Sequence, residues 1–109
     1  MLYLMMSKTN DLYLVKIGYS NGPKNLRQRR SAYYSYNPLA IMRSSCAGSR
    51  ELENDCHNQL TKNNCVRIKG TEWFVVSEEV FNVLYSKGMG AFYPKHQPIH
   101  FLEEFEKRA

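Results

Sequence analysis

The sequence predicts a small α/β (α+β) domain, in which a mixed sheet of three to four strands is flanked by about three helices. Short apolar runs rich in tyrosine, valine and isoleucine alternate along the chain with segments of helical periodicity. Turn residues such as Asn-Gly-Pro and Asn-Pro separate them. The 109 residues, 43% of them hydrophobic, suffice for one core.

The N-terminus predicts two strands joined by a tight loop. The apolar runs are Leu2–Met6 and Leu12–Ser20, and the polar patch Ser7–Asp11 between them is typical of a hairpin loop. The N-terminal run has no basic leader and no small-residue cleavage site, so we interpret it as a strand and not as a signal peptide.

A first helix is expected from Pro23 to about Tyr34. Proline suits the first helical position because its missing N–H would have no partner there, and Leu26 and Tyr33 repeat at helical spacing. A third strand over residues 39–44 follows the Asn-Pro break.

A second helix is expected from Arg50 to Lys62. Its apolar stripe consists of Leu52, Cys56 and Leu60, at positions i, i+4 and i+8. A one-sided stripe of this kind predicts that the helix packs one face against a sheet.

A short extended piece over residues 65–68 and two further elements complete the domain. Residues 71–76 form a short apolar strand, and Ser77 is placed to cap a third helix that ends near Lys87. We therefore expect one domain over residues 1–87, and a C-terminal extension over 88–109 that packs on it or trails from it.

Composition restricts the partners of the chain. Residues 1–50 carry eight basic residues and one acidic residue, so most of the net charge of +5 lies in the first half. A basic half with many tyrosines favours a polyanion such as nucleic acid, although an ordinary basic surface has the same composition. No apolar run approaches the roughly 18 residues that a membrane span needs.

The three cysteines predict reduced thiols. Their number is odd and none forms a Cys-x-x-Cys pair, which favours a cytosolic protein over a disulfide framework or a zinc site.

Four short motifs resemble those of the GIY-YIG nuclease superfamily, in its phage-type branch with Lys-Ile-Gly in the second motif. They are, in chain order, Tyr3; Lys16-Ile17-Gly18; Asn25–Tyr33 (NLRQRRSAY); and Glu51–His57 (ELENDCH) followed by Thr71–Phe74 (TEWF). The third motif places the family arginine at Arg29, with Arg27 as the alternative. Together the motifs cover about residues 1–76.

The resemblance implies a metal-dependent endonuclease that hydrolyses a phosphodiester bond of DNA and nicks one strand. It implies Mg²⁺ or Mn²⁺ as the cofactor, with Glu53 as the metal ligand. Arg29 and Lys16 would neutralise the charge on phosphorus, and Tyr3 or His57 would manage the attacking water. Lys16 stands where the superfamily usually has tyrosine, so the identity of the general base stays open.

The residues themselves support these roles to different degrees. Glu53 lies one position beyond the apolar stripe, about 100° round the helix, which predicts a place at the rim of the buried face. His57 follows four residues later on the same face, where it either serves the reaction or simply pairs with Glu53. The Arg29 guanidinium can bind two phosphate oxygens at once and stays charged at every relevant pH.

Further cationic and aromatic residues are expected to contact nucleic acid outside the reacting centre. They are Tyr19, Lys24, Arg27 and Arg30. The pattern does not separate DNA from RNA, and we expect a monomer or a weak homodimer in the cytoplasm, that of the host for a phage or viral protein.

The alternative function is a catalytically inactive module of phage or viral origin. It would bind nucleic acid, or it would bind a host protein through aromatic residues of the extension, which are Phe92, Tyr93, Phe101 and Phe105.

Overall fold

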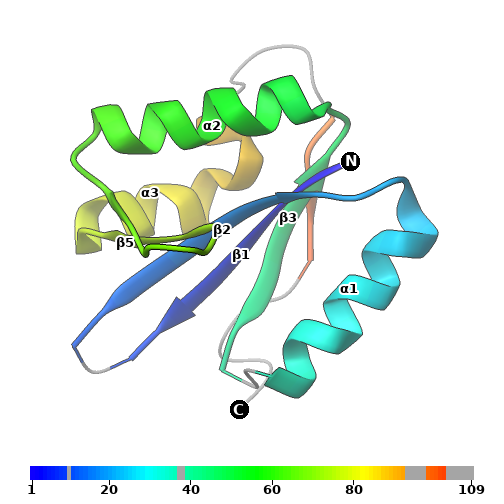
Figure 1. The fold of residues 1–109 in the computed structure, drawn as a ribbon, viewed down its shortest axis with the longest axis horizontal. Helices are drawn as coiled ribbons and strands as arrows, with labels where there is room; N and C mark the ends of the chain where they lie inside the picture. Colours follow the sequence, from blue (N-terminus) through cyan, green and yellow to red (C-terminus); the bar gives the residue numbers. More distant parts are fainter. Residues whose placement is uncertain (10, 37–38, 93–97, 103–109) are drawn as a thin grey trace.

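A six-stranded sheet with helices on both faces forms the centre of the protein (Figure 1). The computed structural model describes residues 1–9, 11–36, 39–92 and 98–102. Its elements are, in chain order, β1 (Leu2–Lys8), β2 (Tyr13–Tyr19), α1 (Pro23–Tyr36), β3 (Ile41–Cys46), α2 (Arg50–Lys62), β4 (Val66–Arg67), β5 (Trp73–Val76), α3 (Glu78–Lys87), the 3₁₀ helix η1 (Gly88–Ala91) and β6 (His100–Phe101).

The expected α+β class with three α-helices is confirmed, but the sheet is larger than predicted. Its order is β4-β5-β2-β1-β3-β6, and all pairings among the described residues are antiparallel. The expected mixed sheet would need a parallel pair of strands. Strands β2 and β3 run in the same direction, but β1 lies between them and is antiparallel to both. Strand β4 falls within the short extended piece expected over residues 65–68. Strand β6 was not expected, because its two residues are too few for a periodic pattern.

The helix boundaries follow local signals. Helix α2 spans the predicted residues, and its N-cap Ser49 accepts a hydrogen bond from the Leu52 N–H. Ser77 caps α3 in the same way. Helix α1 ends at Tyr36, two residues later than predicted, and β3 correspondingly begins at Ile41.

Strand β1 is buried on both faces, which explains its unbroken apolar sequence. Leu2, Leu4 and Met6 face α2 and α3, whereas Tyr3 and Met5 face α1. Figure 1 shows the same division, with α1 on one side of the sheet and the two other helices on the opposite side. Any polar group on the α1 face of the central strands is therefore enclosed between helix and sheet.

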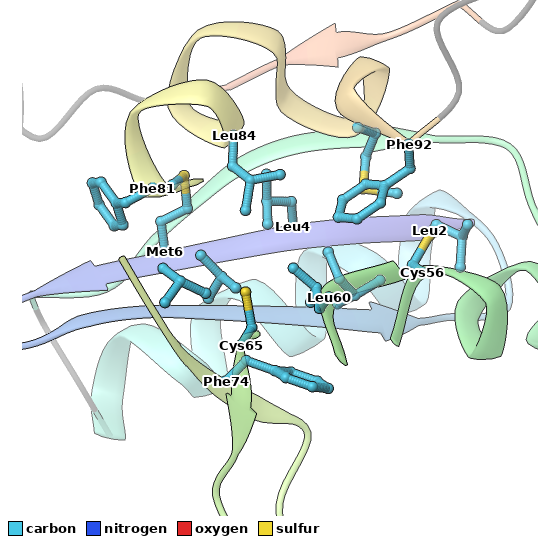
Figure 2. Packing of buried hydrophobic residues seen from close by; sticks show 14 of the residues in the cluster. Leu2, Leu4, Met6, Cys56, Leu60, Cys65, Phe74, Phe81, Leu84 and Phe92 are labelled. Atoms are coloured by element: carbon cyan, nitrogen blue, oxygen red, sulfur yellow. The ribbon is translucent and has the colours of Figure 1, made fainter. Parts of the chain in front are cut away.

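The larger of the two cores lies under α2 and α3 (Figure 2). Leu60 comes from α2, Phe81 and Leu84 come from α3, and all three pack against the apolar face of β1 and β2. The three cysteines are buried free thiols, as expected for a reduced protein.

The C-terminal segment packs against β3 through β6. Phe92 is buried in the larger core, so it is not available to bind a host protein as the docking hypothesis requires. Phe101 is exposed, with the Arg43 guanidinium 4.9 Å from its ring centre. Tyr93 and Phe105 lie outside the described residues. Among the helices in the described part of the chain, none is both long and apolar enough to cross a membrane.

Candidate active site

The candidate site lies where the sheet ladder beside β2 stops. Strand β5 pairs with β2 only from Tyr13 to Lys16. At the next residue the ring of His57, from α2, takes the place of a strand, with Nε2 2.9 Å from the Ile17 carbonyl oxygen. A carbonyl only accepts, so Nε2 carries the proton and donates it. His57 is 7% exposed, and this hydrogen bond connects α2 to β2. Its Nε2 therefore already has a partner and is not open to an attacking water.

Gly18 allows the Tyr3 side chain to cross β2. The two residues are directly opposite each other in the β1–β2 ladder. A Cβ atom on Gly18 would lie 2.2 Å from Tyr3 Cζ, so any larger residue would displace the ring. This contact explains why Tyr3 and the Lys-Ile-Gly motif occur together: glycine leaves the space through which the buried phenol reaches α1.

The hydroxyl group of Tyr33, on α1, is the centre of a hydrogen-bonded cluster. It lies 2.9 Å from the Tyr3 hydroxyl and accepts a hydrogen bond of 2.8 Å from Lys16 Nζ. The Lys16 ammonium also lies 4.1 Å from the centre of the Tyr33 ring, within range of a cation–π interaction. Lys16 is only 9% exposed, so these contacts replace most of its hydration.

Arg29 joins the cluster from one turn earlier on α1. Its guanidinium forms hydrogen bonds with the hydroxyl groups of Tyr3 and Tyr33, while much of the side chain stays exposed. The structure therefore places Arg29 at the phenols, and Arg27, the alternative from the sequence, on the exposed side of α1.

The hydroxyl groups of Tyr3 and Tyr33 differ in pKa because their surroundings differ. Burial raises the pKa of Tyr3 well above its usual range, and its hydrogen bond with Tyr33 adds to this. Burial also disfavours ionisation of Tyr33, but hydrogen bonds from Lys16, Tyr3 and Arg29 outweigh it and lower the pKa of Tyr33. Tyr33 is the phenol that ionises more readily.

Glu53 approaches the cluster from α2. It is 9% exposed, which agrees with its predicted place at the rim of the buried face. Burial raises its carboxyl pKa, and repulsion from Glu72 raises it further, while the charges of His57, Arg50 and Arg29 act in the opposite direction. Arg29 is thus the residue that links the α1 half of the site to the α2 half.

An open cleft of about 510 Å³ gives access to this region. Its lining residues are Lys16, Arg67, Gly70, Thr71, Glu72 and Trp73. The cleft lies between Lys16 of β2 and the β4–β5 segment, so a ligand in it would contact the Lys16 side chain.

The other predicted nucleic-acid contacts do not all lie at this site. Lys24 and Arg27 are exposed on α1, as a phosphate contact requires. Arg30 is partly buried, and its Nε donates to the Tyr34 hydroxyl at 3.1 Å. Tyr19 packs on the opposite face of the sheet, with the Arg50 guanidinium 5.0 Å from its ring centre. Tyr19 is therefore not brought together with Tyr3 and Lys16.

Tyr33 is the site residue that the sequence analysis missed as a functional group. We used it only as a marker of helical spacing, although it stands four residues after Arg29 and so shares its helical face. That spacing was the available signal, but only the fold shows that Lys16 and Tyr3 meet its hydroxyl.

The carboxylates of the site fit a hard divalent cation with few protein ligands. Among the described residues, no group of three or more histidine, cysteine, aspartate or glutamate side chains is placed to share a metal ion. Mg²⁺ is usually held by one or two carboxylates, together with water and substrate phosphates. Glu53 meets this requirement because it is a nine-tenths buried acidic side chain on which the charge of Arg29 acts.

Two cations and a phenol of lowered pKa, facing a buried carboxylate, define a site suited to a phosphate ester. The family model of the T5orf172 domain matches residues 1–87, and the chain belongs to this family. The T5orf172 domain occurs in phage proteins and is related to GIY-YIG-like nuclease folds. No curated protein and no solved structure matches the chain. The class is thus a nuclease-like domain, without assignment to a specific GIY-YIG family.

Replacing Gly18 tests the contact that positions Tyr3. Gly18→Ala is expected to lower the free energy of unfolding by about 1–3 kcal/mol, because the new methyl group overlaps the Tyr3 ring. Urea unfolding followed by circular dichroism measures this change. Gly90→Ala is the matched control, since its Cβ would lie 3.8 Å from Ile99 Cγ1. Equal stability of the two variants would contradict the crossing geometry.

Removing the charge of Glu53 should stabilise the metal-free protein at neutral pH. The folded-state pKa is raised, so the unfolded chain releases this proton at lower pH and stability falls as pH increases above about 4.3. In EDTA, Glu53→Gln is expected to melt at a higher temperature than the intact protein near pH 7, with a difference that shrinks towards pH 4. Thermal unfolding across this range measures it, with the exposed Asp55→Asn as the control. A difference independent of pH would disprove the raised pKa.

Proposed function

We propose that this chain is a metal-dependent endonuclease that hydrolyses phosphodiester bonds of DNA. The observation that carries the proposal is the Tyr33 hydroxyl group, which accepts a hydrogen bond from the buried Lys16 ammonium and contacts both Tyr3 and Arg29. The Tyr33 side chain is partly exposed, and its hydrogen-bond partner Lys16 lines the cleft. Membership of a nuclease-like domain family supports the same function.

Tyr33 is the general base of the proposed reaction. Its lowered pKa increases the fraction of phenolate, and the phenolate oxygen takes a proton from the water that attacks phosphorus in line. Lys16 holds the negative charge of the phenolate in place. Tyr3, buried and of raised pKa, is the neutral hydrogen-bond donor that positions Tyr33.

Arg29 and Lys16 provide the positive charge that the pentavalent phosphate requires. Arg29 retains an exposed face beside the phenols, so its guanidinium can bind phosphate oxygens without leaving the cluster. Preorganised charge of this kind stabilises the transition state because the groups need not reorient during the reaction.

Glu53 is the proposed metal ligand. When bound, Mg²⁺ or Mn²⁺ supplies positive charge at the leaving oxygen. His57 contributes by fixing α2 against β2, which sets the position of Glu53 one turn earlier on the same helix.

Helix α1 offers a path for the DNA backbone. It has no acidic residue and carries Lys24, Arg27, Arg29 and Arg30. Contacts between such side chains and phosphates are independent of base sequence and weaken with salt. One such site cleaves one strand at a time, so we expect nicked rather than linear plasmid.

Cleavage of supercoiled plasmid tests the function. The intact protein with Mg²⁺ or Mn²⁺ is expected to produce nicked circles, and Tyr33→Phe is expected to slow nicking by about 10²–10⁴-fold, the usual contribution of a general base. Tyr13→Phe is the matched control, because Tyr13 lies on β2 but packs against Phe81 on the other face of the sheet. Salt-sensitive DNA binding by the intact protein without nicking would favour the inactive binding module.

The pH profile of nicking separates Tyr33 from other bases. The rate should rise with pH as Tyr33 ionises and level off below about pH 10, the ordinary tyrosine pKa. Lys16→Met removes the hydrogen bond that lowers this pKa, so its rising limb should move to higher pH. Single-turnover rates measured from pH 6 to 10 in steps of roughly half a unit follow the limb. An unchanged midpoint in Lys16→Met would show that Tyr33 is not the base.

A further inference from the structure

We infer that Glu72 is a second carboxylate ligand of the divalent cation, bound opposite Glu53 at the open end of β2. The inference rests on the proposed function and extends it, since it assigns a metal-binding role to a residue outside α2. Three observations carry it: the place of Glu72 in the sheet, an unpartnered oxygen atom, and the lack of a partner for Glu53.

The sheet places Glu72 beside the site. Glu72 directly precedes Trp73, the first residue of β5, and Trp73 is the partner of Lys16 in the β2–β5 ladder. Glu72 therefore stands at the point where this ladder ends. It lines the same cleft as Lys16, and its charge acts on Glu53 of α2.

One oxygen atom of Glu72 is buried without a partner. Within the described part of the chain, Oε2 is the buried side-chain atom for which no hydrogen bond is found. Leaving a carboxylate oxygen in this state is costly, because burial removes its water and nothing replaces it. The cleft walls contain Lys16 and Arg67, yet Lys16 donates to Tyr33 and the Nε of Arg67 donates to the Thr71 carbonyl oxygen.

Glu53 is the other acidic side chain of the inferred metal site. Nine-tenths of its surface is buried, and no hydrogen bond from a described residue reaches its carboxylate. Burial and repulsion from Glu72 raise the pKa of the Glu53 carboxyl, whereas the guanidinium groups of Arg50 and Arg29 act to lower it. A nine-tenths buried Glu53 and a partly buried Glu72 that repel each other are expected where a cation is bound between them.

The carboxylate oxygens of Glu53 and Glu72 favour a hard divalent cation. Oxygen ligands from two carboxylates, with the remaining positions left to water and phosphate oxygens, are typical of Mg²⁺ and also suit Mn²⁺. A structural zinc site would need four protein ligands of the histidine or cysteine type, and the described residues offer no such group.

Binding of Mn²⁺ in the absence of DNA tests the inference without measuring cleavage. Electron paramagnetic resonance of free Mn²⁺ would follow titrations of the intact protein, Glu72→Gln, Glu72→Asp, Glu53→Gln and the exposed control Asp55→Asn. We expect Glu72→Gln and Glu53→Gln each to weaken binding about tenfold or more. Glu72→Asp should retain part of the affinity, and Asp55→Asn should bind like the intact protein. Melting temperatures in EDTA establish that each variant is folded.

The outcomes separate this inference from the proposed function. Unchanged Mn²⁺ affinity in Glu72→Gln, equal weakening by Asp55→Asn, or no Mn²⁺ binding by the intact protein would overturn the role of Glu72. If nicking is observed but Glu72→Gln binds Mn²⁺ normally, the inference fails and the nuclease function stands. If Mn²⁺ binding depends on both glutamates but no nucleic acid is cut, the metal site stands and the proposed function fails.

Discussion

The buried ammonium group of Lys16 is the constraint on which the candidate site depends. A charge that is 9% exposed needs partners inside the protein, and Lys16 finds them in the hydroxyl and the ring of Tyr33. This pairing fixes α1 over the sheet at one point. Because Arg29 is one turn from Tyr33, the same contact also determines where the guanidinium lies relative to Tyr3 and Glu53.

The candidate site contains buried charged and polar side chains, which a protein core usually excludes. The ladder beside β2 ends at Lys16, and the neighbouring positions are occupied by the His57 ring, a nine-tenths buried Glu53 and an unpartnered oxygen of Glu72. Mutual repulsion of the two carboxylates opposes folding of the metal-free protein. Such local instability is common where a protein keeps charged groups ready for a ligand, and the two cores on either side of β1 offset it.

Local signals were sufficient for most of the fold. The boundaries of α2 follow from Ser49 before it and its one-sided apolar stripe, and the same stripe predicted the rim position of Glu53. The sheet could not be predicted to the same degree. Strand β4 falls within the extended piece expected over residues 65–68, and it pairs with the nearby β5. Strand β6 has only two residues and pairs with β3, which is distant in sequence, so no local pattern predicts it.

The sequence by itself determined the α+β class, the helices, the basic first half and the motif residues Tyr3, Lys16 and Arg29. Only the tertiary structure decided which of these groups meet, and therefore their acidity. The pKa of Tyr33 on α1 is lowered by a lysine 17 residues away on β2, against a burial cost that depends on the packing of α1. Proton affinity is set by distance, desolvation and hydrogen bonding in space, and these quantities do not exist until the chain is folded.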